Sequence, residues 1–263
     1  METGLHFLMQ KTKSKISKTF VYQFESNFHI ESSADNITLD FSDNKYISKS
    51  TDFIGDLKIE SVEIVHLNSR PSIVPSLYFD ENIKSKYLIT NTLSSNNILT
   101  DSSKDKKLKI VYSINEKLNE FITKNNLNHS HKNYFTYLYN FLTEIPNKTK
   151  GLSFFVNLNK KSFDIIIFNN NEFIFFNSFE INDENEFLYY LFFVLKNYEG
   201  SNEADKIIFL GKFEAFNDYY NIASKYSRID FIEDHNEIKV LPDSPFFSII
   251  NENYIRNWKK YNY

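Results

Sequence analysis

The chain has 263 residues, of which 41% are hydrophobic and 17% are aromatic, so it is long enough to bury a sizeable core in which rings do much of the packing. Its formal net charge of −4 at pH 7 excludes a general electrostatic attraction to nucleic acids or anionic membranes. It contains no cysteine, which excludes disulfides, a thiolate nucleophile and cysteine-ligated metal sites.

Residues 1–18 are expected to form a mobile basic leader, because they carry several lysines and only a short apolar patch at 5–9. That patch is too short for the core of a signal peptide. No apolar run of about 18 residues is free of charged side chains, so we expect no membrane-spanning segment. Together with the absence of cysteine, these features favour a cytoplasmic protein.

Residues 19–147 are predicted to form the first of two halves. Three short segments alternate apolar and polar residues between polar turns, which predicts a three-stranded meander. A short helix and a fourth strand are expected to follow it. The predicted elements, in chain order, are 20–24, 28–32, 36–41, 46–57 and 61–66.

The remainder of the first half is expected to contain an insertion. Pro71 and Pro75 are predicted to bracket a turn. Residues 91–107 are rich in Ser, Asn and Lys, which indicates a loop or a mobile insertion. The other elements expected here are a helix at 77–87, a strand at 108–114 and helices at 115–124 and 132–145.

Residues 148–263 are predicted to form the second half, which opens with three strands. The apolar runs 153–158, 163–168 and 172–179 are rich in β-branched and aromatic residues. Three asparagines at 169–171 tolerate positive φ, so they predict a tight hairpin between the second and third runs.

A capped helix and a buried strand follow. Asp183 with Glu186 forms a capping-box pattern, which predicts a helix from Asp183 to Tyr198 that ends at Gly200. The apolar run 206–210 predicts a buried strand that turns at Gly211. The last expected elements are a helix at 214–226, a strand at 228–233 and a C-terminal tail whose residues 242–258 pack as a helix across one domain.

The order β-β-β-α-β therefore occurs twice, and it resembles the duplicated ribonuclease-H-like core of the actin, sugar kinase and heat-shock ATPase superfamily. This likeness implies an actin-ATPase-like α/β fold with mixed sheets. More narrowly, the chain resembles an uncharacterised bacterial family known as domain of unknown function 3822, in residues 70–80, 163–168, 175–180 and 183–194. That family has no established activity, so the resemblance implies a fold more than a function.

Active members of the superfamily hold nucleotide phosphates between two hairpins whose turns contain Asp-x-Gly. The matching turns here, 25–27 and 159–162, both lack that pattern. If a nucleotide binds, Lys160 and Lys161 are the candidates for its phosphates, and Gly211 matches part of the adenosine signature. The alternatives are two solvated surface lysines and an ordinary turn into a helix. We predict no cofactor.

Other polar residues give weaker signals. Asp164 lies within an apolar strand, where an unpaired charge would be costly, so it either faces solvent at a sheet edge, which we favour, or has a partner. A two-metal nuclease is not expected, because Asp164, Glu180 and Asp205 do not obviously converge. His129 and His131 could face one metal ion, but no third ligand is apparent, so the spacing is interpreted as fortuitous. We predict no catalytic residue and no metal site.

The leading hypothesis is a non-catalytic, actin-ATPase-like interaction or scaffold protein of the cytoplasm, a pseudo-ATPase with degenerate phosphate turns and an unidentified protein partner. The alternative is an active nucleotide-binding ATPase or kinase of the same superfamily. RNA binding is not expected, because the lysine-rich run 104–109 has no interleaved ring on which a base could stack.

Overall fold

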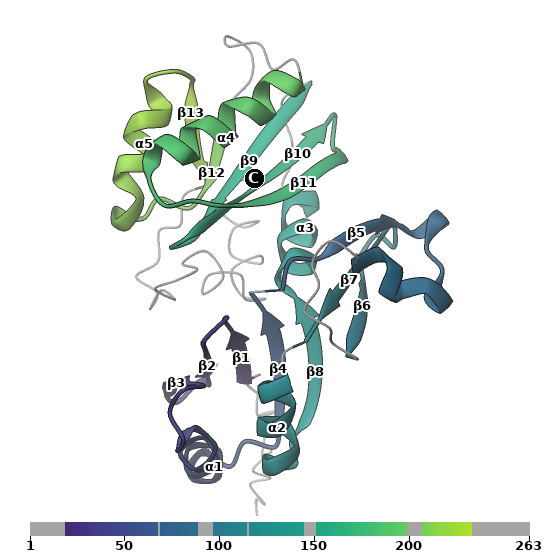
Figure 1. The fold of residues 1–263 in the computed structure, drawn as a ribbon, viewed down its shortest axis with the longest axis vertical. Coiled ribbons are helices and arrows are strands. Elements are labelled where there is room, and N and C mark those ends of the chain that lie inside the picture. The colour runs from purple at the N-terminus through teal and green to yellow at the C-terminus, as the bar shows by residue number, and fades with distance from the viewer. Residues whose placement is uncertain are drawn as a thin grey trace, which may run out of the picture. The chain divides into compact units, whose positions relative to one another are not determined.

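The computed structural model describes residues 19–67, 69–88, 97–114, 116–144, 151–198 and 207–232 (Figure 1). The predicted leader, the loop residues 91–96, Gly200, Asp205 and the C-terminal tail lie outside these residues. Contacts divide the chain into two compact units. The first consists of Met1–His66 and Asn115–His131, and the second of Leu67–Ile114 and Lys132–Tyr263.

The first unit is built on a five-stranded mixed sheet with the order β3-β2-β1-β4-β8. Its strands are β1 (Thr19–Gln23), β2 (Asn27–Glu31), β3 (Asn36–Asp40), β4 (Ser61–His66) and β8 (Asn128–Asn133). The first three strands form the predicted antiparallel meander, and β1 pairs with β4 in parallel. The helices of this unit are α1 (Tyr46–Leu57) and α2 (Glu116–Asn125).

Strand alternation and helix amphipathicity together produce the core of the first unit. On β2, Phe28 and Ile30 are buried while their neighbours along the strand are only partly covered. The buried side of α2 supplies Leu118 and Phe121, and the rings of Phe28 and Phe121 lie 4.9 Å apart. Such ring pairs add specific geometry to the burial of apolar area.

The second unit contains a five-stranded sheet with the order β11-β10-β9-β12-β13. Its strands are β9 (Leu152–Leu158), β10 (Ser162–Asn169), β11 (Glu172–Glu180), β12 (Ile207–Leu210) and β13 (Ile229–Ile232), and its helices are α4 (Glu184–Asn197) and α5 (Asn217–Ser224), which a single 3-10 turn precedes. In both sheets the order is third, second, first, fourth and fifth strand. The predicted fold class, two β-β-β-α-β halves with mixed sheets, is confirmed.

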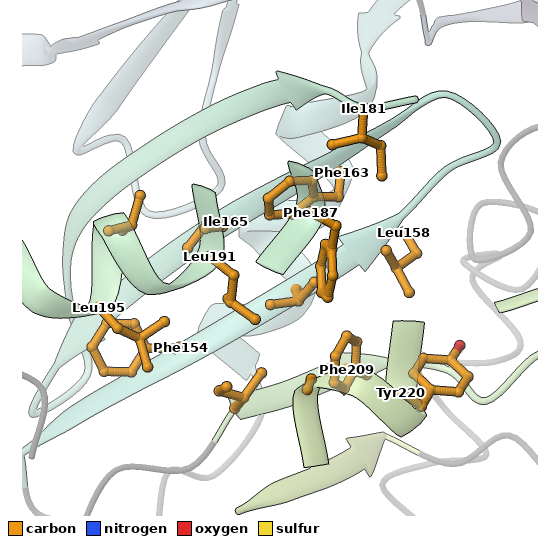
Figure 2. Packing of buried hydrophobic residues seen from close by; sticks show 14 of the residues in the cluster. Phe154, Leu158, Phe163, Ile165, Ile181, Phe187, Leu191, Leu195, Phe209 and Tyr220 are labelled. Atoms are coloured by element: carbon orange, nitrogen blue, oxygen red, sulfur yellow. The ribbon is translucent and has the colours of Figure 1, made fainter. Parts of the chain in front are cut away.

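Helix α4 packs its buried side against this second sheet (Figure 2). The carboxylate of Asp183 accepts hydrogen bonds from the backbone N–H groups of Asn185 and Glu186, at 2.8 and 2.9 Å, as the capping pattern predicts. Glu186 accepts from the backbone N–H of Asn182 instead of Asp183, so the box closes one residue earlier than predicted. The ring of Phe187 contacts the ring of Phe163 at 4.8 Å.

Two turns depend on left-handed backbone conformations. Asn170 and Asn171 have φ of 47° and 69° and reverse the chain between β10 and β11, as predicted. Gly211 has a φ of 80°, and a Cβ added there would lie 2.4 Å from the ring of Phe213. The backbone angle therefore favours glycine after β12, and a side chain there would also have to displace the Phe213 ring.

The structure corrects the sequence analysis in the insertion. A three-stranded sheet has the order β5-β7-β6, with β5 (Ser72–Pro75), β6 (Ile98–Ser102) and β7 (Leu108–Ser113). The predicted turn between the prolines is strand β5, and the predicted loop contains strand β6. Pro75 is tolerated because β5 is an edge strand, where a missing N–H disrupts no ladder on the open side. The predicted helix at 77–87 consists of two 3-10 segments, Ser76–Tyr78 and Glu81–Leu88.

Helix α3 (Tyr134–Glu144) begins two residues later than predicted, because β8 continues through Asn133. The side-chain oxygen of Asn133 accepts a hydrogen bond from the backbone N–H of Phe135 and so caps the helix. Contacts place the insertion and α3 with the second sheet. The division of the duplicated halves near residue 147 stays a prediction.

Candidate functional site

The three candidate nucleotide-binding residues lie at one end of the second sheet, just after the carboxyl ends of the inner strands β9 and β12. Strand β9 ends at the turn that contains Lys160 and Lys161, where the Asn159 N–H donates to the Ser162 carbonyl at 2.8 Å. Strand β12 runs parallel to β9 with Phe209 opposite Val156, so Gly211, which follows β12, lies at this same end of the sheet. Both lysines are exposed and Gly211 is buried.

The first sheet has a turn of the same construction between β1 and β2. The Phe24 N–H donates to the Asn27 carbonyl at 2.8 Å, which leaves Glu25 and Ser26 at the tip. Among the described residues with positive φ, none lies at the tip of either turn. A phosphate site built from backbone N–H groups typically needs glycine or a left-handed residue at such a tip. These two turns present side chains instead.

Asp164 is buried, which corrects the preferred prediction of a solvent-facing edge. It lies on β10, between β9 and β11, and is 1% exposed. One carboxylate oxygen accepts from Nδ2 of Asn157 at 2.8 Å, and the other accepts from the hydroxyl of Tyr134 at 3.1 Å. Burial raises the pKa of Asp164, although its hydrogen bonds oppose that shift. The alternative prediction, that Asp164 has a partner, is confirmed.

A second buried carboxylate, Asp101, holds the start of α3. It accepts from the Asn133 N–H at 2.8 Å, from the Thr136 hydroxyl at 2.7 Å and from the Tyr112 hydroxyl at 3.1 Å. Burial raises its pKa as well. Asp101 was not among the candidate residues, because the composition of 91–107 predicted a loop there. The signal was present in the apolar pair Ile98 and Leu99, which opens β6.

These contacts limit the chemistry that the two acids can perform. Mg²⁺ in proteins is usually held by carboxylate oxygens that remain open to the ion and its waters. The oxygens of Asp164 and Asp101 are instead buried against protein donors. Within the described ranges, no group of three or more His, Asp or Glu side chains is arranged to hold a metal ion.

Three histidines gather in the first unit. His66 on β4 is fully buried, with its Nδ1 2.7 Å from Oε1 of Gln23 and its Nε2 3.0 Å from Nδ1 of His131. The amide oxygen can only accept, so Nδ1 of His66 donates to it, and Nε2 accepts from His131. The ring of His129 lies 5.1 Å from that of His131. His66 was missed because it comes from another strand.

Acid is expected to destabilise the first unit through this histidine pair. Burial lowers the pKa of His66 to about 3 and that of His131 to about 4, and a neighbouring imidazole adds to each shift. The unfolded chain therefore takes up protons that the folded chain lacks as the pH falls below 6.5, so the free energy of unfolding decreases from there towards pH 4. Denaturant unfolding at a series of pH values measures this slope.

His131→Gln is the matched variant for that measurement. Its side-chain amide can still donate to Nε2 of His66, but it cannot titrate. We expect a shallower loss of stability with acid than in the unchanged protein. An identical slope in both proteins would mean that His131 does not contribute.

The fold places the chain in a class of known structures. A protein of unknown function with an actin-like ATPase fold from Bacteroides thetaiotaomicron VPI-5482 aligns with a TM-score of 0.67 and 16% identity, over 86% of this chain and 94% of that one. A PilM-PilN type IV pilus biogenesis complex aligns with a TM-score of 0.55 and 7% identity, over 89% and 96% of the two chains. The chain has an actin-like ATPase fold.

The family follows from the sequence. The profile described as protein of unknown function (DUF3822) matches residues 1–229, and the chain belongs to this family. No protein of the curated set matches the chain. In the part of the chain that the structure describes, no helix combines the length and apolarity needed to cross a membrane.

Proposed function

We propose that this chain is a cytoplasmic, non-catalytic interaction or scaffold protein that uses an actin-like ATPase fold to bind another protein. The observation that carries the proposal is that the carboxylate of Asp164 is buried and hydrogen-bonded to protein side chains. It is the only acid between residues 152 and 169, and it is buried against Asn157 and Tyr134. Phosphoryl transfer depends on carboxylates that position Mg²⁺ and on backbone groups that approach the phosphates.

The turns 25–27 and 159–162, which follow strands β1 and β9, support the same conclusion. Neither turn contains glycine, so side chains stand where backbone N–H groups would have to approach a phosphate. The PilM-PilN type IV pilus biogenesis complex bears on the partner, since it is a complex that contains a chain of similar fold. An unidentified protein partner is therefore part of the proposal.

Mg-ATP at millimolar concentration is expected to leave the melting temperature unchanged within error. A ligand at one hundred times its dissociation constant would stabilise the folded state by about 2.7 kcal/mol. For a chain of this size, each kcal/mol raises the melting temperature by roughly 2–4 °C. A thermal melt with and without Mg-ATP or Mg-ADP tests the proposal.

The alternative is an active nucleotide-binding ATPase or kinase, and one observation favours it. Lys160, Lys161 and Gly211 lie at the same end of the second sheet, after the carboxyl ends of β9 and β12. A reproducible rise of about 5 °C or more with nucleotide would support this alternative. The double variant Lys160→Ala with Lys161→Ala should then abolish the rise, because it removes the only cationic groups of that turn.

A further inference from the structure

Helix α4 exposes aromatic side chains on its outer side. Residues 187–195 are nine consecutive apolar residues, so the helix is apolar around most of its circumference. Its inner side packs against the sheet, but Tyr189 is 66% exposed and Phe193 is 54% exposed. Their rings lie nearly parallel, with centroids 6.3 Å apart. A helix that is apolar all round is normally covered on all sides.

A groove extends this surface towards the sheet. It has a volume of about 510 Å³ and lies between α4 and β11, the edge strand of the second sheet. Its walls are formed by Phe175, Asn177 and Phe179 from β11, by Phe193, Val194 and Asn197 from α4, and by Tyr198, which follows α4. Phe193 therefore belongs both to the exposed ring pair and to the groove. We call this continuous surface the α4–β11 face.

The sequence contains a segment of matching chemistry after β13. Ser244 followed by Pro245 is a typical helix start, with a capping side chain and a proline in the first turn. Apolar residues then recur at helical spacing on one side, at Phe247, Ile250, Tyr254 and Trp258. Of the eight positions between them, six are polar (Ser248, Asn251, Glu252, Asn253, Arg256 and Asn257) and two are apolar (Ile249 and Ile255). An amphipathic helix of this kind needs an apolar surface to cover its stripe.

Length and reach also agree. Helix α4 has 14 residues and residues 245–258 are also 14, so each would extend about 21 Å as a helix. Strand β13 ends at Ile232 in the same compact unit as α4. The connecting residues 233–243 can span roughly 36 Å when extended. The segment can therefore reach along the whole of α4.

Charge selects one direction for the pairing. Helix α4 begins with the acidic residues Asp183, Glu184 and Glu186, whereas Lys196 lies in its last turn. The segment carries its basic residues at the opposite end, at Arg256, Lys259 and Lys260. An antiparallel arrangement brings these basic residues beside the acidic end of α4, where opposite charges attract.

We propose that residues 244–258 dock as an amphipathic helix, antiparallel to α4, on the α4–β11 face of the same chain. The docked segment covers Tyr189 and Phe193 and leaves its polar side in solvent. This assignment holds whether or not a nucleotide binds elsewhere in the protein.

Trp258 is the only tryptophan of the chain, so its fluorescence reports directly on the segment. In the full-length protein we expect blue-shifted emission and weak quenching by acrylamide. The double variant Tyr189→Ser with Phe193→Ser should shift the emission to longer wavelength and increase the quenching constant several-fold. Ile250→Asp with Tyr254→Asp should do the same without altering any described residue.

The control is Leu77→Ser with Tyr78→Ser, which removes two exposed apolar side chains, 86% and 73% exposed, elsewhere in the same unit. This variant should leave the Trp258 emission unchanged. For the direction, a zero-length carbodiimide reagent should join Glu186, which lies three residues before Tyr189 on the same side of α4, to Lys259 or Lys260, as identified by mass spectrometry of tryptic peptides.

Three results would overturn the proposal. The first is solvent-exposed Trp258 emission in the unchanged protein. The second is a protected Trp258 whose emission the Tyr189 and Phe193 variant does not alter. The third is protection that disappears on dilution together with a dimer seen by sedimentation, which would mean that the face is covered by a second copy.

Discussion

Leu191→Asp is expected to prevent stable folding of the second unit. Leu191 is fully buried on the inner side of α4, within the cluster that also contains Phe163 and Phe187 (Figure 2). An unpaired carboxylate in such a core costs several kcal/mol. The total stability of a folded domain is only about 5–15 kcal/mol. Circular dichroism and urea unfolding of the purified variant measure the loss.

Tyr189→Asp is the matched control for this experiment, since it places the same residue two positions away on the exposed side of the same helix. It should retain the far-ultraviolet spectrum and most of the unfolding free energy, with its main effect on Trp258 emission. A soluble Leu191→Asp protein with an unchanged unfolding transition would show that α4 is peripheral and that the core has been assigned incorrectly.

Asp164→Ala is expected to produce the second large loss of stability. The substitution leaves the Asn157 amide and the Tyr134 hydroxyl without their buried acceptor. Each unsatisfied buried group costs about 1–3 kcal/mol, so for these two groups we expect a total loss of about 2–6 kcal/mol. Asp164→Asn should cost much less, because its amide oxygen can still accept from Tyr134. Its amide nitrogen can also donate to Asn157 if that side chain reorients, because Oδ1 of Asn157 accepts no hydrogen bond among the described residues.

The stability of the unchanged protein and that of Asp164→Asn are expected to depend differently on pH. Because burial raises the pKa of Asp164 above 3.8, the folded chain keeps a proton that the unfolded chain has released. This contribution is therefore most favourable at low pH and is lost as the pH rises from 3.8 through the folded-state pKa. Asp164→Asn removes it, so the stability of the variant relative to the unchanged protein should rise over that window. A constant difference would contradict a raised pKa.

A buried Asp164 also changes how the hairpin is understood. Its polar groups stabilise the contact between α3 and the second sheet, since Tyr134 belongs to α3. The same helix is held at its start by Asp101 from β6. Asp164 thus connects α3 to the five-stranded sheet, and Asp101 connects α3 to the three-stranded sheet. This structural role is consistent with the proposed non-catalytic function.

Much of the secondary structure could be predicted because its signals are local. The hairpin after β10 requires left-handed residues, which Asn170 and Asn171 provide, and Asp183 caps α4 as its sequence pattern indicates. The errors fall at strands whose own residues give a weak strand signal. Strands β5 and β6 are short and polar at one end, and they become strands by pairing with β7 on either side. Such context overrides intrinsic propensity in sheets.

The sequence by itself determined the order of the elements within the two β-β-β-α-β halves and the turns that lack glycine, because caps, turns and periodicity act over a few neighbouring residues. Only the tertiary structure decided which polar side chains meet. Asp164 and Tyr134 are 30 positions apart, and His66 and His131 are 65 apart. The periodicity of one strand does not identify the helix or strand that packs against it, so burial, protonation and partners had to come from the folded chain.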